Sequence, residues 1–416
     1  MPSFPSGRTS KITIGLGVLS LLTACASNGG PPSGNGGSQG VTDTSIKVAG
    51  LLTKTSSIGY STAEAELGAK ARFERANAGG GVNGRKIEFL GAENDSMDPA
   101  TGLAATRRLV EKDGVFAIVP VSAPSFSGME YLEQRKTPWF GWITNPAQCG
   151  LSTAFGYNGC LTPKPGVKLA PWWGEQITAE LGGKDKSVWL QGTDTTSSKA
   201  GTEAIRQTFS DTGFKITGVA NTVPAGAPPQ DWLPYVNKVK AASGGGWPDI
   251  VASIMSGVKH NNGFYAALKK AGFKGMITDA TSYDPKVLAD PQSVAALEGV
   301  YVGLQVAAFE SRSPEVELMK QDLRRTGGQD IVFSQQMAIG YWSADVFLKV
   351  LEKTGEDVTR ESFLKASDGF SYENAGFGRI AYPRNKTLSS GCGTLVQIVG
   401  GGFRVAQELK CVDPVE

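Results

Sequence analysis

The sequence is poor in the side chains on which metal and proton-transfer chemistry depend. Its 416 residues include a single histidine, His260, although histidine is the usual zinc ligand and the usual proton carrier near neutral pH. We place His260 in a solvated turn. We therefore expect no catalytic centre, no metal site and no cofactor.

Net charge is also nearly absent. Lysine and arginine number 41 against 39 aspartate and glutamate, and Arg8 and Lys11, both in residues 1–24, account for the excess. Nucleic-acid binding requires a positive surface, and a polybasic membrane patch requires a similar excess of positive charge. We expect neither a nucleic-acid partner nor a polybasic contact with membranes.

Apolar runs long enough to span a membrane are missing as well. Residues 12–22 are apolar but too short to cross a bilayer comfortably, and no later stretch has 18 uninterrupted apolar residues. Residues 1–24, with a basic start and this apolar run, are typical of a signal peptide. The segment Leu22-Thr23-Ala24-Cys25 looks like a bacterial lipobox, in which Cys25 becomes the lipidated first residue. An ordinary secretory signal that ends near a cysteine is the alternative interpretation.

Residues 25–43 are rich in glycine, serine and proline (SNGGPPSGNGGSQG within them) and cannot bury apolar surface. They predict a flexible tether before a folded domain that starts near Thr44. Together, the signal and tether predict an exported protein, anchored to the outer face of the cytoplasmic membrane by lipidated Cys25.

The remaining cysteines form two pairs that are close in the sequence. Cys149 and Cys160 are eleven residues apart, and Cys392 and Cys411 flank a predicted hairpin. Disulfides suit an exported protein, so we predict the pairs 149–160 and 392–411. Four cysteines allow three pairings, and only proximity in the sequence selects this one. Four free buried thiols are the alternative.

Strand-like and helix-like segments alternate after the tether, which indicates parallel α/β sheets. The late helices and a final hairpin break this rhythm. The predicted helices cover residues 61–77, 98–112, 125–135, 169–181, 198–210, 232–242, 262–271, 314–326, 335–353 and 361–366. The predicted strands cover residues 46–52, 85–90, 115–119, 187–190, 215–221, 250–254 and 275–278, and the hairpin covers 392–411.

Four segments carry a family resemblance: IKVAGLLT, GAKARFERANAGGGVNGRKIEF, NDSMDPATGLAATRRLVEKDGVFAIV and YLEQRKTPWF. Their order is similar to that in type I periplasmic binding proteins, in the Leu/Ile/Val-binding branch of ABC-transporter substrate-binding lipoproteins. The resemblance implies an α/β fold of two doubly wound lobes, joined by three crossovers, with a ligand cleft between them. It predicts lobe 1 at residues 44–165 and 305–374, and lobe 2 at 166–304 and 375–416.

The resemblance also implies ligand contacts from loops that follow strands. Ser122 and the backbone amide of Ala123 are expected to bind a ligand carboxylate, because a helix predicted to open at Ser125 favours anions. Ser125 itself is either a contact or simply the helix N-cap. The other contacts implied in lobe 1 are Tyr60, Trp142 and Thr144; for Trp142, plain packing is the alternative.

Lobe 2 departs from the family pattern, in which a tyrosine and an acid usually contact the ligand. The residues at these places are Ser197, Ser198 (also a natural N-cap), Ser256, Asp279 and Thr281. Asp279 is the acid within reach of a ligand ammonium, and a solvated loop acid is its alternative interpretation. The long connection 145–165 is predicted to be either an aromatic lid, carrying Phe155 and Tyr157, or a surface elaboration.

These inferences predict a monomeric binding protein of an ABC importer and not an enzyme. It would capture a small amino-acid-like or carboxylate-bearing solute by cleft closure and deliver it to permease and ATPase subunits. A ligand-sensing lipoprotein that signals to a membrane partner is the alternative. Because the acid is displaced and serines are frequent in lobe 2, we favour a carboxylate-bearing or neutral ligand that lacks an ammonium, and our hypothesis is that the carboxylate contact at Ser122 is kept.

Overall fold

The computed structural model describes residues 38–56, 60–183, 185–255 and 257–414. The described residues belong to one compact unit. The predicted signal peptide, the lipidated Cys25, most of the tether and the Ser256 contact lie outside them. Within these ranges, no helix combines the length and the apolar character needed to cross a membrane.

The first sheet has five parallel strands in the order β2-β1-β3-β4-β5. This order is doubly wound, and the topological switch point lies between β1 and β3. Its strands are β1 (Ser45–Leu52), β2 (Lys86–Asn94), β3 (Ala117–Ser122), β4 (Trp139–Ile143) and β5 (Ala154–Cys160). Its connecting helices are α1 (Ala65–Ala78), α2 (Pro99–Arg107) with the π-helical turn η1 (Arg108–Lys112), α3 (Met129–Gln134) and the short η2 (Pro146–Gln148).

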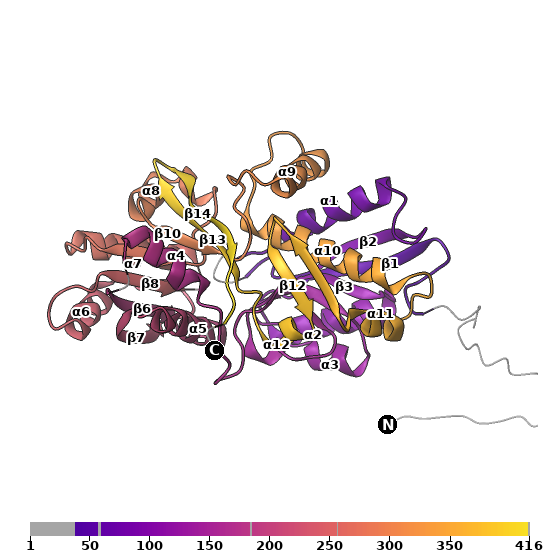
Figure 1. Cartoon of the computed structure of the whole chain (residues 1–416), viewed down its shortest axis with the longest axis horizontal. Helices are drawn as coiled ribbons and strands as arrows, with labels where there is room; N and C mark the ends of the chain where they lie inside the picture. The colour runs from indigo at the N-terminus through magenta and orange to yellow at the C-terminus, as the bar shows by residue number, and fades with distance from the viewer. Residues whose placement is uncertain (1–37, 57–59, 184, 256, 415–416) are drawn as a thin grey trace, which may run out of the picture. The chain divides into compact units, whose positions relative to one another are not determined.

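The second sheet has the order β14-β13-β10-β9-β8-β6-β7, and its last five strands repeat the doubly wound order. The C-terminal hairpin adds to it antiparallel, through β10 and β13; in Figure 1 this yellow hairpin lies beside β10. Its strands are β6 (Ser187–Thr193), β7 (Lys215–Val223), β8 (Ile250–Ile254), β9 (Met276–Asp279), β10 (Tyr301–Leu304), β13 (Cys392–Val399) and β14 (Gly402–Cys411). Its helices are α4 (Trp172–Leu181), α5 (Thr196–Asp211), α6 (Leu233–Ala242), α7 (Val258–Lys270), η3 (Val287–Ala289) and α8 (Pro291–Leu297).

The late part of the chain returns to the first sheet. Helix α10 lies against α1, β3 and β4, and its Phe347 packs edge-on against Phe140 of β4 at 5.5 Å between ring centroids. The late elements are α9 (Pro314–Gly327), α10 (Gln335–Thr354), α11 (Arg360–Ser367), the paired strands β11 (Phe370–Asn374) and β12 (Gly378–Tyr382), and α12 (Arg384–Thr387).

Three connections therefore run between the two sheets: residues 161–171, 305–313 and 388–391. The two doubly wound lobes and three crossovers confirm the predicted fold class. The residue limits predicted for the lobes stay a prediction.

Both predicted disulfides are present, Cys149–Cys160 and Cys392–Cys411. The helix predicted from residue 98 has Asp98 as its N-cap, because the Asp98 carboxylate accepts a hydrogen bond from the amide of Thr101 at 2.8 Å.

The lid and the surface elaboration predicted for residues 145–165 are both wrong, because this segment supplies strand β5 of the first sheet. Phe155 stacks on Phe140 with ring centroids 4.6 Å apart, and Tyr157 is likewise buried. Two apolar rings at this spacing in the core cannot also form a mobile cover. The disulfide between Cys149 and Cys160 closes the connection that leads into this strand.

The prediction for His260 is also wrong. It lies in α7, is buried, and its Nε2 is 3.2 Å from the carbonyl oxygen of Pro224. Burial lowers the pKa of its imidazole, since it penalises the charged form.

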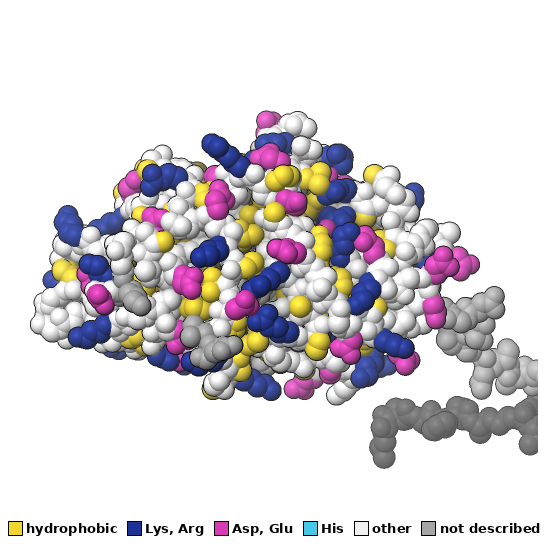
Figure 2. Space-filling view, in the orientation of Figure 1, with side chains coloured by type: hydrophobic (Ala, Val, Ile, Leu, Met, Phe, Trp, Pro, Cys, Tyr) yellow, Lys and Arg dark blue, Asp and Glu magenta, His cyan; other side chains and the backbone are white. Residues whose placement is uncertain are grey.

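The molecular surface carries charges of both signs. Figure 2 shows lysine and arginine interspersed with aspartate and glutamate over the face that it draws. Exposed side chains of opposite charge also form ion pairs, such as Lys70 with Glu74. Positive and negative side chains, which are nearly equal in number in the sequence, are thus also intermixed on the face that Figure 2 draws.

Candidate ligand cleft

A cavity of about 470 Å³ lies where the strands of both sheets end. From the first sheet, Trp142 lies at the end of β4, with Thr144 just beyond it, and Leu161 follows β5. From the second sheet, Met255 follows β8 and Ala280 follows β9. Parallel strands present their carboxyl ends at one edge of a sheet, and open α/β folds bind ligands in the crevice outside that edge.

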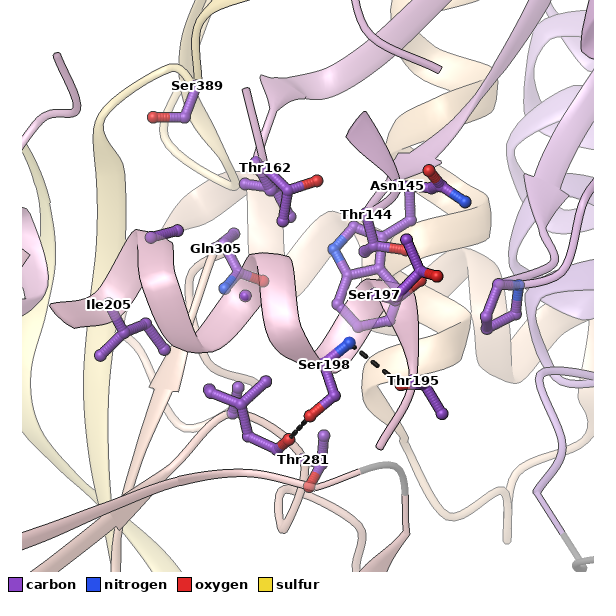
Figure 3. A pocket seen from close by; sticks show the side chains of 18 of the residues that line it. Thr144, Asn145, Thr162, Thr195, Ser197, Ser198, Ile205, Thr281, Gln305 and Ser389 are labelled. Atoms are coloured by element: carbon purple, nitrogen blue, oxygen red, sulfur yellow. Dashed lines mark hydrogen bonds between the residues drawn. The ribbon is translucent and has the colours of Figure 1, made fainter. Parts of the chain in front are cut away.

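All three crossovers reach this cavity. Leu161 and Thr162 come from the first, Gln305 from the second and Ser389 from the third. Figure 3 shows Thr162, Gln305 and Ser389 on the side of helix α5 away from Thr195. The cavity is therefore bounded by both lobes and by the segments that join them, so a change in the angle between the lobes would change its shape.

Seven of the predicted contacts line the cavity: Tyr60, Ser125, Trp142, Thr144, Ser197, Ser198 and Thr281. Three do not: Ser122, Ala123 and Asp279. The role of each as a ligand contact stays a prediction, and the surroundings of each are described below.

Ser122 and Ala123 are buried at the end of β3. The carbonyl oxygen of Ser122 accepts hydrogen bonds from the amide of Thr53 at 3.2 Å and from Oγ1 of Thr62 at 2.6 Å. These contacts tie β3 to the end of β1, so Ser122 helps to hold the two strands together at the switch point.

The helix predicted to open at Ser125 begins instead at Met129. The amide of Phe126 donates to the carbonyl oxygen of Ala123 at 3.0 Å, which makes a turn. This turn buries the ring of Phe126 edge-on against Trp139, at 5.3 Å between centroids. Burial of an aromatic ring outweighs the local capping preference of Ser125, so the predicted N-cap at Ser125 is wrong. Carboxylate binding by Ser122 and the amide of Ala123 stays a prediction, now without the helix N-terminus that was expected to favour it.

Helix α5 begins at Thr196, two residues before the predicted N-cap Ser198. Thr195 is the cap, because its hydroxyl accepts from the amide of Ser198 at 3.1 Å. The Ser198 hydroxyl accepts from the amide of Thr193 at 2.9 Å and donates to the carbonyl oxygen of Ile254; Figure 3 draws the bonds of Ser198 to Thr195 and to the chain below α5. This hydroxyl thus joins α5 to β6 and β8, whereas the neighbouring Ser197 lines the cavity from the first turn of α5.

Asp279 is buried beneath the cavity floor and already has partners. Its carboxylate accepts hydrogen bonds from Tyr265 at 2.9 Å, from Ser282 at 2.5 Å and from Asn261 at 3.1 Å. Desolvation raises its pKa. The same carboxylate accepts from the amide of Thr281, so Asp279 holds in place the loop from which Thr281 faces the cavity.

No aspartate, glutamate, lysine, arginine or histidine lines the cavity among the described residues. Most of the wall is apolar, and the stacked indoles of Trp172 and Trp173 form one side of it. The hydroxyl of Tyr60 has a pKa raised by burial, so it stays a neutral hydrogen-bonding group. Within the described ranges, no group of three acidic, cysteine or histidine side chains could hold a metal ion.

Among the described residues, three side chains of the lining have a buried polar atom without a partner: Nε1 of Trp142, Oγ1 of Thr162 and Oε1 of Gln305. Such an atom costs about 1–3 kcal/mol, so a ligand group that reached one of them would recover that cost. Of the three, only Trp142 was expected from the sequence. Thr162 and Gln305 lie in crossovers, whose positions no local pattern reveals.

A cavity bounded by two doubly wound lobes and their crossovers is the architecture of a two-lobed solute-binding protein. The chain belongs to the periplasmic binding protein family, whose model matches residues 45–402. Its fold is that of the type I periplasmic binding proteins. No curated protein matches it.

Several solved structures share this fold. A fatty acid ABC transporter substrate-binding protein from Thermomonospora curvata is 16% identical with a TM-score of 0.70, over 90% of this chain and 94% of that one. A solute-binding protein of an ABC transporter from R. palustris, in complex with benzoate, is 14% identical with a TM-score of 0.67, over 89% and 99%. A leucine-binding protein from Thermotoga maritima is 16% identical with a TM-score of 0.69, over 88% and 99%.

Proposed function

We propose that this protein is the substrate-binding component of an ABC importer, which captures a small carboxylate-bearing solute without an ammonium group by closure of its lobes. Membership of the periplasmic binding protein family supports capture and delivery. Similar proteins named for fatty acid and benzoate take carboxylates without an ammonium, and another is named for leucine. Its partners would be permease and ATPase subunits, and the protein itself would be a monomer.

The observation that carries the solute class is the absence of charged side chains among the described residues of the cavity lining. An α-amino acid would bring an ammonium group into a closed cleft, where an unpaired charge costs several kcal/mol. The acid expected from the sequence, Asp279, does not line the cavity and accepts hydrogen bonds from Tyr265, Ser282 and Asn261. A carboxylate can be held by neutral donors such as the indole of Trp142 and the hydroxyl of Thr162.

The matched probes for this proposal are hexanoate, norleucine and hexanamide, which share one chain and differ in the polar end. Calorimetric titration of protein that starts at Ser38, the first described residue of the compact unit, should show binding of hexanoate. Norleucine, which only adds the ammonium, should bind at least about tenfold more weakly, because that charge finds no partner. Norleucine binding as tight as hexanoate would contradict the solute class.

Hexanamide tests whether the site recognises the negative charge of the carboxylate, because it has the chain of hexanoate and a neutral polar end. If the neutral donors hold a carboxylate, the amide should bind more weakly than the acid, because hydrogen bonds to charged groups are stronger. Equal binding of amide and acid would show that the site selects the chain alone.

We also propose that lipidated Cys25 anchors the protein to the outer face of the cytoplasmic membrane, with residues 25–43 as the tether. The segment Leu22-Thr23-Ala24-Cys25 supports this proposal. Mass spectrometry of the N-terminal peptide from the native host should find Cys25 as the first residue, carrying a diacylglyceryl group. A mature N-terminus elsewhere, or an unmodified Cys25, would contradict it.

A further inference from the structure

One side of the cavity runs along helix α5. The residues that α5 contributes are Ser197, Ser198, Gly201, Ala204, Ile205 and Thr208. Their spacing of three and four places them on one face of the helix, and the eleven residue steps from Ser197 to Thr208 span about 16 Å. In Figure 3, Ile205 lies along α5 well away from Ser197 and Ser198. The cavity is thus elongated along three turns of this helix.

The helix face is covered at Gly201, because a Cβ added there would be only 3.0 Å from the side chain of Ile254. One turn further along, Ala204 presents only a methyl group to the cavity. The facing wall comes from the first crossover and the start of α4, and it consists of Leu169, Ala170, Trp172 and Trp173. These wall residues are all buried and apolar. We call the space between Ala204, Ile205 and Thr208 and this wall the α5 groove.

Buried polar groups without partners indicate that the ligand also has a polar end. Thr162 and Gln305 are more than nine-tenths buried, and their Oγ1 and Oε1 atoms have no partner. The amide of Gln305 can present either its oxygen or its nitrogen, because the two ends are exchangeable. Nε1 of Trp142 is the third such atom on a lining residue among those described. A ligand with one polar end can supply the missing partner to any of them, while its remainder meets apolar walls.

We infer that the α5 groove is a binding subsite for an unbranched apolar tail, so that the solute is a single-chain monocarboxylate of medium length. This inference rests on the proposed function and adds to it the shape of the solute. A cavity of about 470 Å³ lies within the range of roughly 300–1,000 Å³ typical of sites for drug-sized ligands. A short acid would leave the groove to water, whereas a longer chain removes its apolar walls from water.

The test is a homologous series of butanoate, hexanoate, octanoate and decanoate, titrated below micelle-forming concentrations into protein that starts at Ser38. Each added methylene that enters the groove should tighten the Kd by up to about fourfold. The gain should stop at the length that fills the groove. Equal affinity across the series would overturn the groove while leaving the proposed importer function intact.

Ala204→Phe fills the groove from the face of α5. We expect decanoate to bind at least about tenfold more weakly to this variant, and butanoate to stay within about twofold. The matched control is Ser210→Phe, which places the same ring on an exposed position of the same helix and should leave the whole series unchanged. Equal weakening of all four acids by Ala204→Phe would contradict the subsite.

Ile205→Ala gives a second readout that does not depend on the fold tolerating a larger side chain. By lengthening the groove, it should move the preferred chain length upward by one or two methylenes. An unchanged optimum would overturn the inference. If norleucine bound as well as hexanoate, the solute class of the proposed function would fail, and the chain-length series would still decide the groove.

Discussion

The ligand cavity and a second cavity beside helix α10 differ in the charge of the described residues that line them. The second cavity, of about 790 Å³, is bounded by α1, α9, α10, β11 and β14, and it is lined by several charged residues. Arg72 there donates to Asp345 at 2.6 Å, and Asp345 also accepts from the hydroxyl of Tyr372 at 2.9 Å. Among the side chains described there, Trp342 has a buried indole nitrogen without a partner.

The two cavities differ in what their polar groups bind: in one they bind other residues of the chain, and in the other some have no partner within the described residues. The charges around Arg72 join helix α1 to α10 and to β11, so their partners belong to the chain itself. The ligand cavity has no charged lining residue among those described, and Thr162 and Gln305 there have unpartnered atoms. The larger cavity is thus the less suitable one for a mostly apolar solute, because volume does not determine binding chemistry.

Arg72→Met should produce the largest effect on stability. It leaves Asp345 buried without its partner, and breaking a buried ion pair in this way costs about 3–5 kcal/mol. Urea unfolding should show this loss, while titration with hexanoate should give an unchanged Kd. If hexanoate binding weakened in the folded variant, the division between the two cavities would be wrong.

Two controls accompany this prediction. Lys70→Met removes an exposed charge of the same helix, which pairs with Glu74 at 3.7 Å, and should change stability by less than about 0.5 kcal/mol. The double variant Arg72→Met with Asp345→Leu should recover much of the loss, because no buried charge then remains unpaired.

Asp279→Ala should come next, and it tests whether this acid belongs to the fold or to the ligand. The change removes the acceptor of the buried hydroxyls of Tyr265 and Ser282, at a cost of about 2–3 kcal/mol. Thermal unfolding measures this loss. Because Asp279 does not line the cavity, the preference for hexanoate over norleucine should persist, and its reversal or loss would assign Asp279 to the ligand.

Thr162→Val should show the opposite pattern, with affinity rather than stability affected. Oγ1 of Thr162 is buried without a partner, so its replacement by a methyl group should leave the ligand-free protein as stable as before or slightly more stable. Hexanoate should bind about tenfold more weakly, the equivalent of ~1.4 kcal/mol. Unchanged affinity would show that Thr162 does not contact the solute.

The smallest effect concerns pH. Burial places the pKa of His260 below its ordinary value, so the unfolded chain takes up a proton first as the pH falls through about 6.5. The stability that His260 contributes at pH 7.5 should therefore be lost progressively as the pH falls through about 6.5. The urea midpoint should fall less between pH 7.5 and 5.5 in His260→Gln than in the unchanged protein, and equal falls would contradict the shift.

Ligand affinity, unlike stability, should depend little on pH, since no titratable acid, lysine or histidine lines the ligand cavity among the described residues. The Kd for hexanoate should stay within about twofold between pH 6.5 and 8, because no lining group there changes its charge in this interval.

Much of the fold could be predicted from local patterns, and less of the site. Helix α10 follows the apolar periodicity of residues 335–353, and the cap at Asp98 follows from a side chain that bonds to its own turn. Strand β5 was missed because a disulfide-closed connection with Gly150, Gly156 and Gly159 resembles a surface loop. The start of α3 was missed because the burial of Phe126 outweighed the capping preference of Ser125.

The sequence by itself determined the doubly wound lobes, the two disulfide pairs and the loops from which seven predicted residues reach the cavity. The alternation of strands and helices and the cysteine pairs are local properties of the chain, whereas the two lobes and the seven loop residues followed from the family resemblance. Only the tertiary structure decided that Asp279 bonds within its own lobe, that Ser198 joins α5 to β8, and that Thr162 and Gln305 meet in one cavity. Whether a polar atom has a partner depends on residues far away in the sequence, and those meet only in the folded chain.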